Sequence, residues 1–455
     1  MERLIQTIQE HMFEGEFGLE KECLRVYADG RLANSPHPFS NPRFDRDFAE
    51  PQLEMITKVC SDEESVLSEI AQMDETAQKT LEALSPQEYL HPSSIPPATI
   101  LLPPEAGSAQ EPLCIRPQEL SSVHPASFSG KLAWKSRYRA DLLRHYGAGR
   151  MLLSGIHFNF SWPAALLAPY AAQEKRNGGT HRIDRVDHCP RQNVPDSLKD
   201  QLYLRLAARL YQFAYLPVLL FASAPGGPPD HNGNPMYASV RCGRAGYWNE
   251  QQLFPDFSGV CPYIDSVETM VLQKKIELPS ELYLPVRLKS GGTHSMEQLC
   301  EDGISYIEYR LLDLDPLSPH AVRAEAVTFL HDLMIYLTLS EGEKEEPGGT
   351  DEADGACNKK SAAAFFFGPE KQREAMEKIY DAALFSPSRE RIAEGRKMLL
   401  LMADFFRTKT PERFRKRGQQ TAERMMALAE LLKGQRHVIC TSSHAYSVQS
   451  VRWIK

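Results

Sequence analysis

FGLEKECLRV, residues 17–26, is the segment from which the architecture of this 455-residue chain follows. Its apolar and polar side chains alternate, so a strand here places Glu20 and Glu22 on one face. The segments SGIHFNFSW (154–162) and ISYIEYRLLD (304–313) alternate in the same way. Polar strand faces favour an antiparallel sheet, because the strands of a parallel sheet are buried on both faces and read as apolar runs.

Between these strands the sequence shows helical periodicity. The strand and helix patterns together predict an α+β fold. Ser61 and Glu64 have the spacing of a capping box, and apolar residues then repeat at helical intervals from Val66 to Leu84. A second long helix is predicted to start near Asp196 or Ser197. Further predicted elements are a helix over 138–146 and strands over 237–241, 281–289 and 304–312.

Domain organisation is predicted from changes in composition along the chain. Residues 92–129 are rich in Pro and Ser and predict an extended surface loop. Residues 341–360, EGEKEEPGGTDEADGACNKK, are charged and Gly-rich, which is typical of a mobile loop. We expect residues 1–455 to form a single domain, with this acidic loop and a helical C-terminal part over 364–455.

Charge and apolar content exclude several classes of function. The 52 basic residues are outnumbered by 60 acidic ones, giving a net charge of −8, so a broad basic surface for nucleic acid or anionic lipid is not expected. The chain contains no apolar run long enough to span a membrane, and its N-terminus does not resemble a secretory signal. Nine irregularly spaced cysteines do not predict a disulfide framework. A cytoplasmic location is the expectation.

The polar strand faces carry groups that can hold a metal ion. Like charges in a pocket raise one another's pKa unless a cation neutralises them, and Mg²⁺ prefers oxygen ligands. Candidate ligands on or near these strands are Glu20, Glu22, Asp47, Glu54, Glu308 and the imidazole of His157, which would suit two or three Mg²⁺ ions and a nucleotide.

Each of these features also has a simpler interpretation. A Glu-x-Glu strand is more often a solvated face, and a lone His157 is more often structural. Arg310, two residues after Glu308, could be a surface salt-bridge partner worth less than ~1 kcal/mol. The chain has no Walker A, GxGxxG, HExxH or GxSxG motif, and Asp313 with Asp315 lacks the Gly and terminal Glu of a calcium loop.

The combination of segments is more specific than any one of them. Six segments occur in this order: GLEKECLRV, DFAEPQLEMIT, SGIHFNFSW, YASVRCGRAGYWN, ELYLPVR and GISYIEYRLLDLDPLSP. Through them, over residues 15–339, the chain closely resembles bacterial glutamate–cysteine ligases, including the ligase module of bifunctional glutathione-synthesising enzymes. Because the additional ATP-grasp region of the bifunctional type is lacking, we expect a stand-alone enzyme for the first step.

The resemblance implies a fold, a reaction and a set of site residues. The fold would be a curved, mainly antiparallel sheet forming a funnel with surrounding helices, similar to glutamine synthetase. The reaction would join the γ-carboxylate of L-glutamate to the amine of L-cysteine through a γ-glutamyl phosphate, with ATP as co-substrate and Mg²⁺, or alternatively Mn²⁺, as the metal. No nucleic acid, membrane or protein partner is implied.

By the same resemblance, residues in this chain take individual roles. Arg310 would contact the transferring phosphoryl group, and the metal ligands would be the six residues named above. The substrate-binding residues would be Phe48, Tyr138, Arg139, Leu142, Met151, Arg241, Tyr247 and Tyr283.

Met151 departs from the family pattern, because many members carry a glutamine there that is associated with the cysteine site. A methionine removes a hydrogen-bonding amide and adds a flexible apolar thioether. A related γ-glutamyl ligase that uses another amine or amino acid as acceptor is therefore an alternative. A non-catalytic protein that binds a nucleotide or an amino acid on the same scaffold is a third hypothesis.

Overall fold

The computed structural model describes residues 1–97, 99–101, 113–115, 125–126, 133–171, 195–229, 231–292, 295–340 and 367–434. The predicted acidic loop at 341–360 lies outside these ranges, and so does most of the predicted surface loop at 92–129.

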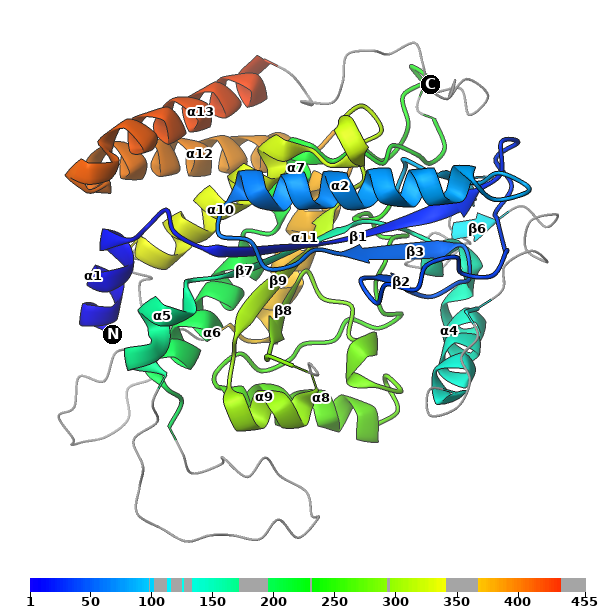
Figure 1. Ribbon diagram of the computed structural model, residues 1–455. Coiled ribbons are helices and arrows are strands. Elements are labelled where there is room, and N and C mark those ends of the chain that lie inside the picture. Colours follow the sequence, from blue (N-terminus) through cyan, green and yellow to red (C-terminus); the bar gives the residue numbers. More distant parts are fainter. Residues whose placement is uncertain are drawn as a thin grey trace, which may run out of the picture.

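An antiparallel sheet forms the centre of the molecule (Figure 1). Its strands follow the order β2-β3-β1-β7-β9-β8, with β4 paired to the end of β1, and every pair of neighbours is antiparallel. β5 and β6 form a separate two-stranded sheet. The strands are β1 (Glu16–Val26), β2 (Phe44–Arg46), β3 (Gln52–Ile56), β4 (Tyr89–Leu90), β5 (Thr99–Leu101), β6 (Leu113–Ile115), β7 (Ile156–Ser161), β8 (Val286–Lys289) and β9 (Tyr306–Leu312).

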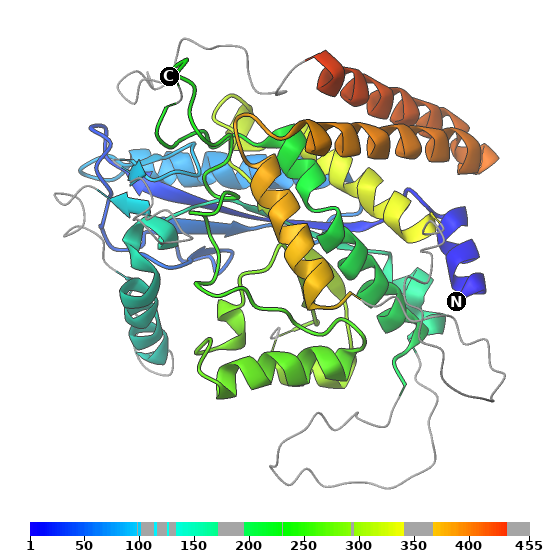
Figure 2. The same ribbon diagram turned by 180° about the vertical axis from the view of Figure 1, so that it is seen from behind.

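Helices pack around this sheet, which confirms a mixed helical and antiparallel fold. The helix α2 packs along β1, α7 packs on β9, and α12 and α13 lie side by side (Figure 1). Seen from behind, the orange α11 lies beside the green α7 (Figure 2). The α-helices are α1 (Glu2–Glu10), α2 (Glu63–Glu82), α4 (Ala133–Met151), α5 (Ala164–Leu167), α6 (Leu198–Gln212), α7 (Tyr215–Phe221), α8 (Val260–Leu272), α9 (Met296–Asp302), α10 (Ala324–Leu339), α11 (Pro369–Ala382), α12 (Arg389–Lys409) and α13 (Arg415–Gly434), with short 3₁₀ turns at Ala168–Tyr170, Pro279–Glu281, Pro319–Ala321 and Glu412–Phe414.

The two faces of the sheet are buried by different groups. Phe17 and Leu19 of β1 and Phe158 of β7 belong to the main apolar core, which also contains residues of α2, α6, α7 and α10. The alternate residues of β1 point to the other face, where Leu24 joins a smaller apolar cluster that includes Leu142 and Met151 of α4. Alternation therefore separates the structural core from the face that carries the polar residues.

Local details differ from the predictions at three places. The helix α2 is capped by Asp62, whose side chain accepts from the Ser65 amide, and not by Ser61. The predicted strand over 237–241 is reduced to isolated bridges at Tyr237 and Ser239. The predicted strand over 281–289 begins only at Val286, after a 3₁₀ turn and Pro285.

Other expectations agree with the structure. Ser197 caps α6 by accepting from the Asp200 amide. In the C-terminal region the described residues form three helices within 369–434, while the single-domain assignment stays a prediction. Among the described residues, no helix has the length and apolar character required to cross a bilayer.

Candidate active site

Three central strands bring two carboxylates and a histidine together. Glu20 of β1 pairs with His157 of β7, and Asn159 of β7 pairs with Glu308 of β9. His157 Nδ1 lies 3.2 Å from Glu20 Oε2 and 3.3 Å from Glu308 Oε1. One possible ligand atom from each of these three side chains lies within 4.8 Å of the others. This acid–histidine cluster, Glu20–His157–Glu308, is the candidate metal centre.

The other predicted metal ligands flank the cluster. Glu22 Oε1 lies 3.3 Å from His157 Nε2, and Glu54 faces Glu22 across the β1–β3 ladder. Burial raises the pKa of Glu54 well above its ordinary value, and the nearby charges of Glu20 and Asp47 raise it further. Burial also raises the pKa of Glu22, although His157 partly offsets it. These carboxylates thus gather where negative charge is uncompensated, which favours a bound cation.

Two cationic side chains, Arg310 and Lys289, also contact Glu308. Arg310 Nη1 donates to Glu308 Oε1 at 3.0 Å, and Lys289 Nζ lies 3.3 Å from Glu308 Oε2. Burial alone would raise the pKa of Glu308, but the charges of Arg310 and Lys289, together with His157, outweigh burial and hold it well below its ordinary value. Burial opposes the charge of Arg310, yet Glu308 and Glu22 outweigh it and raise its pKa. Glu308 is therefore ionised at neutral pH.

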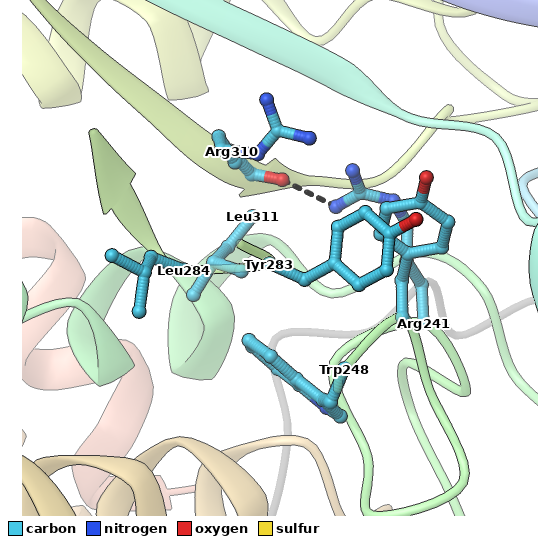
Figure 3. Close-up of a pocket in the computed structure, with 7 residues that line it drawn as sticks. Arg241, Trp248, Tyr283, Leu284, Arg310 and Leu311 are labelled. Carbon is cyan, nitrogen blue, oxygen red and sulfur yellow. Dashed lines mark hydrogen bonds between the residues drawn. The ribbon is translucent and has the colours of Figure 1, made fainter. Parts of the chain in front are cut away.

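Arg310 also lines a pocket beside the cluster (Figure 3). The backbone carbonyl of Arg310 accepts a hydrogen bond from Arg241 Nη1, which enters from the loop after α7. Two glycines permit this approach: a Cβ on Gly155 would lie 2.4 Å from Arg241 Cζ, and one on Gly246 would lie 1.9 Å from the Arg241 carbonyl oxygen. The pocket is lined by Arg241, Tyr247, Trp248, Tyr283, Leu284, Arg310 and Leu311.

Most of the predicted substrate-binding residues lie in one apolar cluster next to this pocket. The rings of Tyr247 and Tyr283 have centroids 4.4 Å apart, and the Tyr283 hydroxyl lies 4.0 Å from Met151 Sδ. Arg139, next to Tyr138 on α4, donates to the carbonyl of Arg46 and is close enough to Asp47 for their charges to interact. Because this apolar cluster contains the residues predicted to bind the acceptor, we name it the acceptor cluster; among its members are Leu24, Phe48, Leu142, Met151 and Tyr283, with Tyr138 and Tyr247 packed against them.

Sequence reasoning did not assign roles to two residues that contact the acid–histidine cluster. Asn159 Nδ2 donates to Glu20 Oε1 at 2.8 Å, and Lys289 forms the ion pair with Glu308. Asn159 follows His157 by two positions on a strand, so the shared face was a readable signal. The contact of Lys289 depends on the pairing of β8 with β9, for which the sequence offers no signal.

The chemistry of the cluster fits a divalent cation. His157 Nε2 and Glu308 Oε2 are buried, and among the described residues each has only a charged contact at 3.3 Å, to Glu22 and Lys289 respectively, without the alignment of a hydrogen bond. Buried polar atoms in native proteins usually make well-aligned hydrogen bonds, so both atoms keep a lone pair that a bound cation could use. Two carboxylates and an imidazole are ligands that Mg²⁺ or Mn²⁺ accepts. Nearby cationic side chains could bind phosphate groups that accompany such an ion.

Comparison with known proteins identifies relatives over most of the chain. The family model for glutamate-cysteine ligase matches residues 1–277 and 265–358. The glutathione biosynthesis bifunctional protein GshAB of Listeria innocua is 32% identical over 360 residues, which cover 74% of this chain and 42% of that protein. The corresponding protein of Clostridium perfringens is 31% identical over 361 residues, covering 74% of this chain and 42% of its own length. The chain thus spans about two fifths of these relatives.

Two solved structures share the fold. A bifunctional glutathione synthetase from Pasteurella multocida matches with a TM-score of 0.66 and 23% identity, covering 94% of this chain and 50% of that one. A glutamate–cysteine ligase from Francisella tularensis, solved in complex with AMP, matches with a TM-score of 0.65 and 17% identity, covering 92% and 83%.

Proposed function

Since the chain belongs to the glutamate-cysteine ligase family, we propose that it joins the γ-carboxylate of glutamate to the amine of cysteine at the expense of ATP. The product would be γ-glutamylcysteine, the first intermediate of glutathione biosynthesis. The bifunctional relatives, named for glutathione biosynthesis, support this assignment. The observation that carries this proposal is the acid–histidine cluster. Its Glu308 accepts a hydrogen bond from Arg310, and the cluster adjoins the acceptor cluster.

The acid–histidine cluster would hold the metal that accompanies ATP. Glu20, His157 and Glu308 would be its inner ligands, and Glu22, Glu54 and Asp47 would complete the acidic surroundings. When bound there, Mg²⁺ would neutralise phosphate charge, so that an anionic carboxylate can approach an anionic triphosphate.

Residues of the chain would then stabilise the two chemical steps. A carboxylate is a poor electrophile, so a γ-carboxylate oxygen of glutamate first bonds to the γ-phosphorus of ATP, and ADP leaves. The buried guanidinium of Arg310 is suited to the charge on the transferring phosphoryl group, because electrostatic stabilisation is strongest where water is excluded. The neutral amine of cysteine next attacks the γ-carbonyl carbon, and inorganic phosphate leaves.

Residues of the pocket and of the acceptor cluster would make the remaining contacts with the substrates. Arg241 would hold a carboxylate of glutamate, because a guanidinium binds carboxylates through paired hydrogen bonds. The apolar side chains of Phe48, Leu142 and Tyr283 would surround the cysteine side chain. Tyr138, Arg139, Met151 and Tyr247 would complete the substrate-binding set.

Two structural features belong to the same proposal. We infer that the sheet is curved into a funnel similar to that of glutamine synthetase, with the site on its inner face. We also infer that residues 1–455 form one catalytic domain.

A different acceptor is the second candidate function, and Met151 favours it. Met151 is 1% exposed and lies within 4.0 Å of the Tyr283 hydroxyl, so an amide is absent where many family members have one. The test is mass spectrometry of the product formed from Mg²⁺, ATP, glutamate and a mixed pool of amino acids. γ-Glutamylcysteine as the main product supports the first function, another γ-glutamyl amide supports the second, and ATP binding without ADP formation contradicts both.

A further inference from the structure

Gln52 carries a buried amide without hydrogen bonds. It is 0% exposed, and neither its Nε2 nor its Oε1 has a hydrogen-bond partner among the described residues. A glutamine side chain offers two donors and an acceptor, and leaving such groups unpaired in the interior is destabilising. Both backbone groups of Gln52, by contrast, form hydrogen bonds: the backbone N–H donates to the carbonyl of Ala49, and the backbone carbonyl accepts from the N–H of Asp47.

The position of Gln52 places this amide beside the acceptor cluster. Gln52 pairs directly with Leu24 in the β1–β3 ladder, so both side chains lie on the same face of the sheet. Leu24 is a member of the acceptor cluster together with Phe48 and Met151. Glu54, two residues along β3, shares that face and leads toward the acid–histidine cluster. Gln52 therefore lies on the sheet face that carries both the apolar cluster and the acidic groups, next to Leu24 and two residues from Glu54.

The surroundings of Gln52 suit the polar backbone groups of a bound amino acid. The acceptor cluster is apolar and fits a small side chain such as that of cysteine, but Met151 offers it no strong hydrogen-bond partner. An amide that is buried and unpaired in the free protein can regain its hydrogen bonds when a ligand fills the site.

We propose that Gln52 is a specificity-determining residue that hydrogen-bonds the α-carboxylate of the acceptor amino acid through its Nε2 amide. This inference rests on the proposed ligase function and adds a contact to the acceptor site. Gln52 thus supplies, from β3, an amide that the site lacks at position 151.

The test is Gln52→Leu, which keeps the volume of the side chain and removes its polar atoms. With glutamate and Mg·ATP saturating, the KM for cysteine should rise roughly 5- to 10-fold, the usual effect of one lost hydrogen bond. The KM for 2-aminobutyrate, which has no thiol, should rise by the same factor. The KM values for ATP and glutamate should not change, and Tm should stay equal or increase because an unpaired buried amide is removed.

A matched control is Gln372→Leu. Gln372 is also buried, but its Nε2 donates to the carbonyls of Pro255 and Phe367, so its loss should lower Tm and leave the KM for cysteine unchanged. An unchanged KM for cysteine in Gln52→Leu would overturn the inference, as would a lowered Tm with all three KM values altered. A change for cysteine but not for 2-aminobutyrate would also overturn it, because the contact would then be to the thiol.

Adding Met151→Gln to Gln52→Leu supplies a further check. If the missing contact is an amide, the double variant should recover most of the affinity for cysteine; no recovery, with the cluster still folded, counts against the proposal. Failure of the ligase assignment would be seen separately, because wild-type protein would then form no γ-glutamyl product from cysteine.

Discussion

Replacing Glu308 by glutamine preserves the shape of the side chain and removes its charge. In the wild type, Glu308 is fully buried and contacts Arg310 at 3.0 Å, Lys289 at 3.3 Å and His157 at 3.3 Å. Removing one partner of a buried ion pair typically costs 3–5 kcal/mol, and the amide can still accept one hydrogen bond, so we expect a loss of about 3 kcal/mol in unfolding free energy. The urea midpoint should fall accordingly.

The catalytic activity of this variant should also decrease. Glu308→Gln removes a proposed metal ligand and changes the surroundings of Arg310, so ADP release dependent on glutamate and cysteine should fall at least 100-fold, a loss typical of a missing electrostatic contact. Glu297→Gln is the matched control, because Glu297 is exposed and lies on α9 outside the site. Wild-type turnover in Glu308→Gln, or an unchanged urea midpoint, would refute the reasoning.

Three more outcomes are expected. Burial opposes the ionisation of Glu63, but His331 and Arg417 outweigh it and lower its pKa from 4.5 to about 2. That depressed pKa should stabilise the fold by about 3 kcal/mol above pH 4.5, so Glu63→Gln should unfold at a lower urea concentration than the wild type at pH 7. The difference in unfolding free energy should disappear as the pH falls toward 2. A substitution of the exposed Glu64 should show no such difference. Gly155→Ala should displace the Arg241 guanidinium and raise the KM for glutamate at least 10-fold, and an unchanged KM would show that Arg241 does not bind it. Removing metal with EDTA should abolish turnover, with Mg²⁺ or Mn²⁺ restoring it; turnover that persists in EDTA would exclude a metal-dependent reaction.

The alternation of side chains between the two faces of each strand could be predicted directly from the sequence. It separated Glu20 and Glu22 from Leu19 because side chains on a strand alternate between faces. The partner strands could not be read in this way. Glu20 meets His157 through pairing between residues 137 positions apart, and this register is set by packing of the whole sheet.

Predictions failed where glycine and proline change the backbone. The segment around Arg241 has the composition of a strand, yet it forms a turn in which Gly246 approaches the Arg241 carbonyl. Residues 281–285 precede β8 in a 3₁₀ turn and an extended segment that ends at Pro285, which has no amide hydrogen to donate to a strand.

The acceptor site shows a further limit of sequence reasoning. Met151 stands out in the sequence because the family resemblance gives that position an expected residue type, whereas no pattern in the sequence distinguishes Gln52. Its complete burial results from tertiary packing around β3, which no local pattern records.

The proposed chemistry depends on one transfer of oxygen. Glutamate labelled with ¹⁸O in its γ-carboxylate should be incubated with the enzyme, Mg²⁺, ATP and cysteine, and the released phosphate should be analysed by mass spectrometry. If the γ-carboxylate is phosphorylated before the amine attacks, each phosphate carries one ¹⁸O atom. Unlabelled phosphate, released while γ-glutamylcysteine forms, would contradict the acyl-phosphate mechanism.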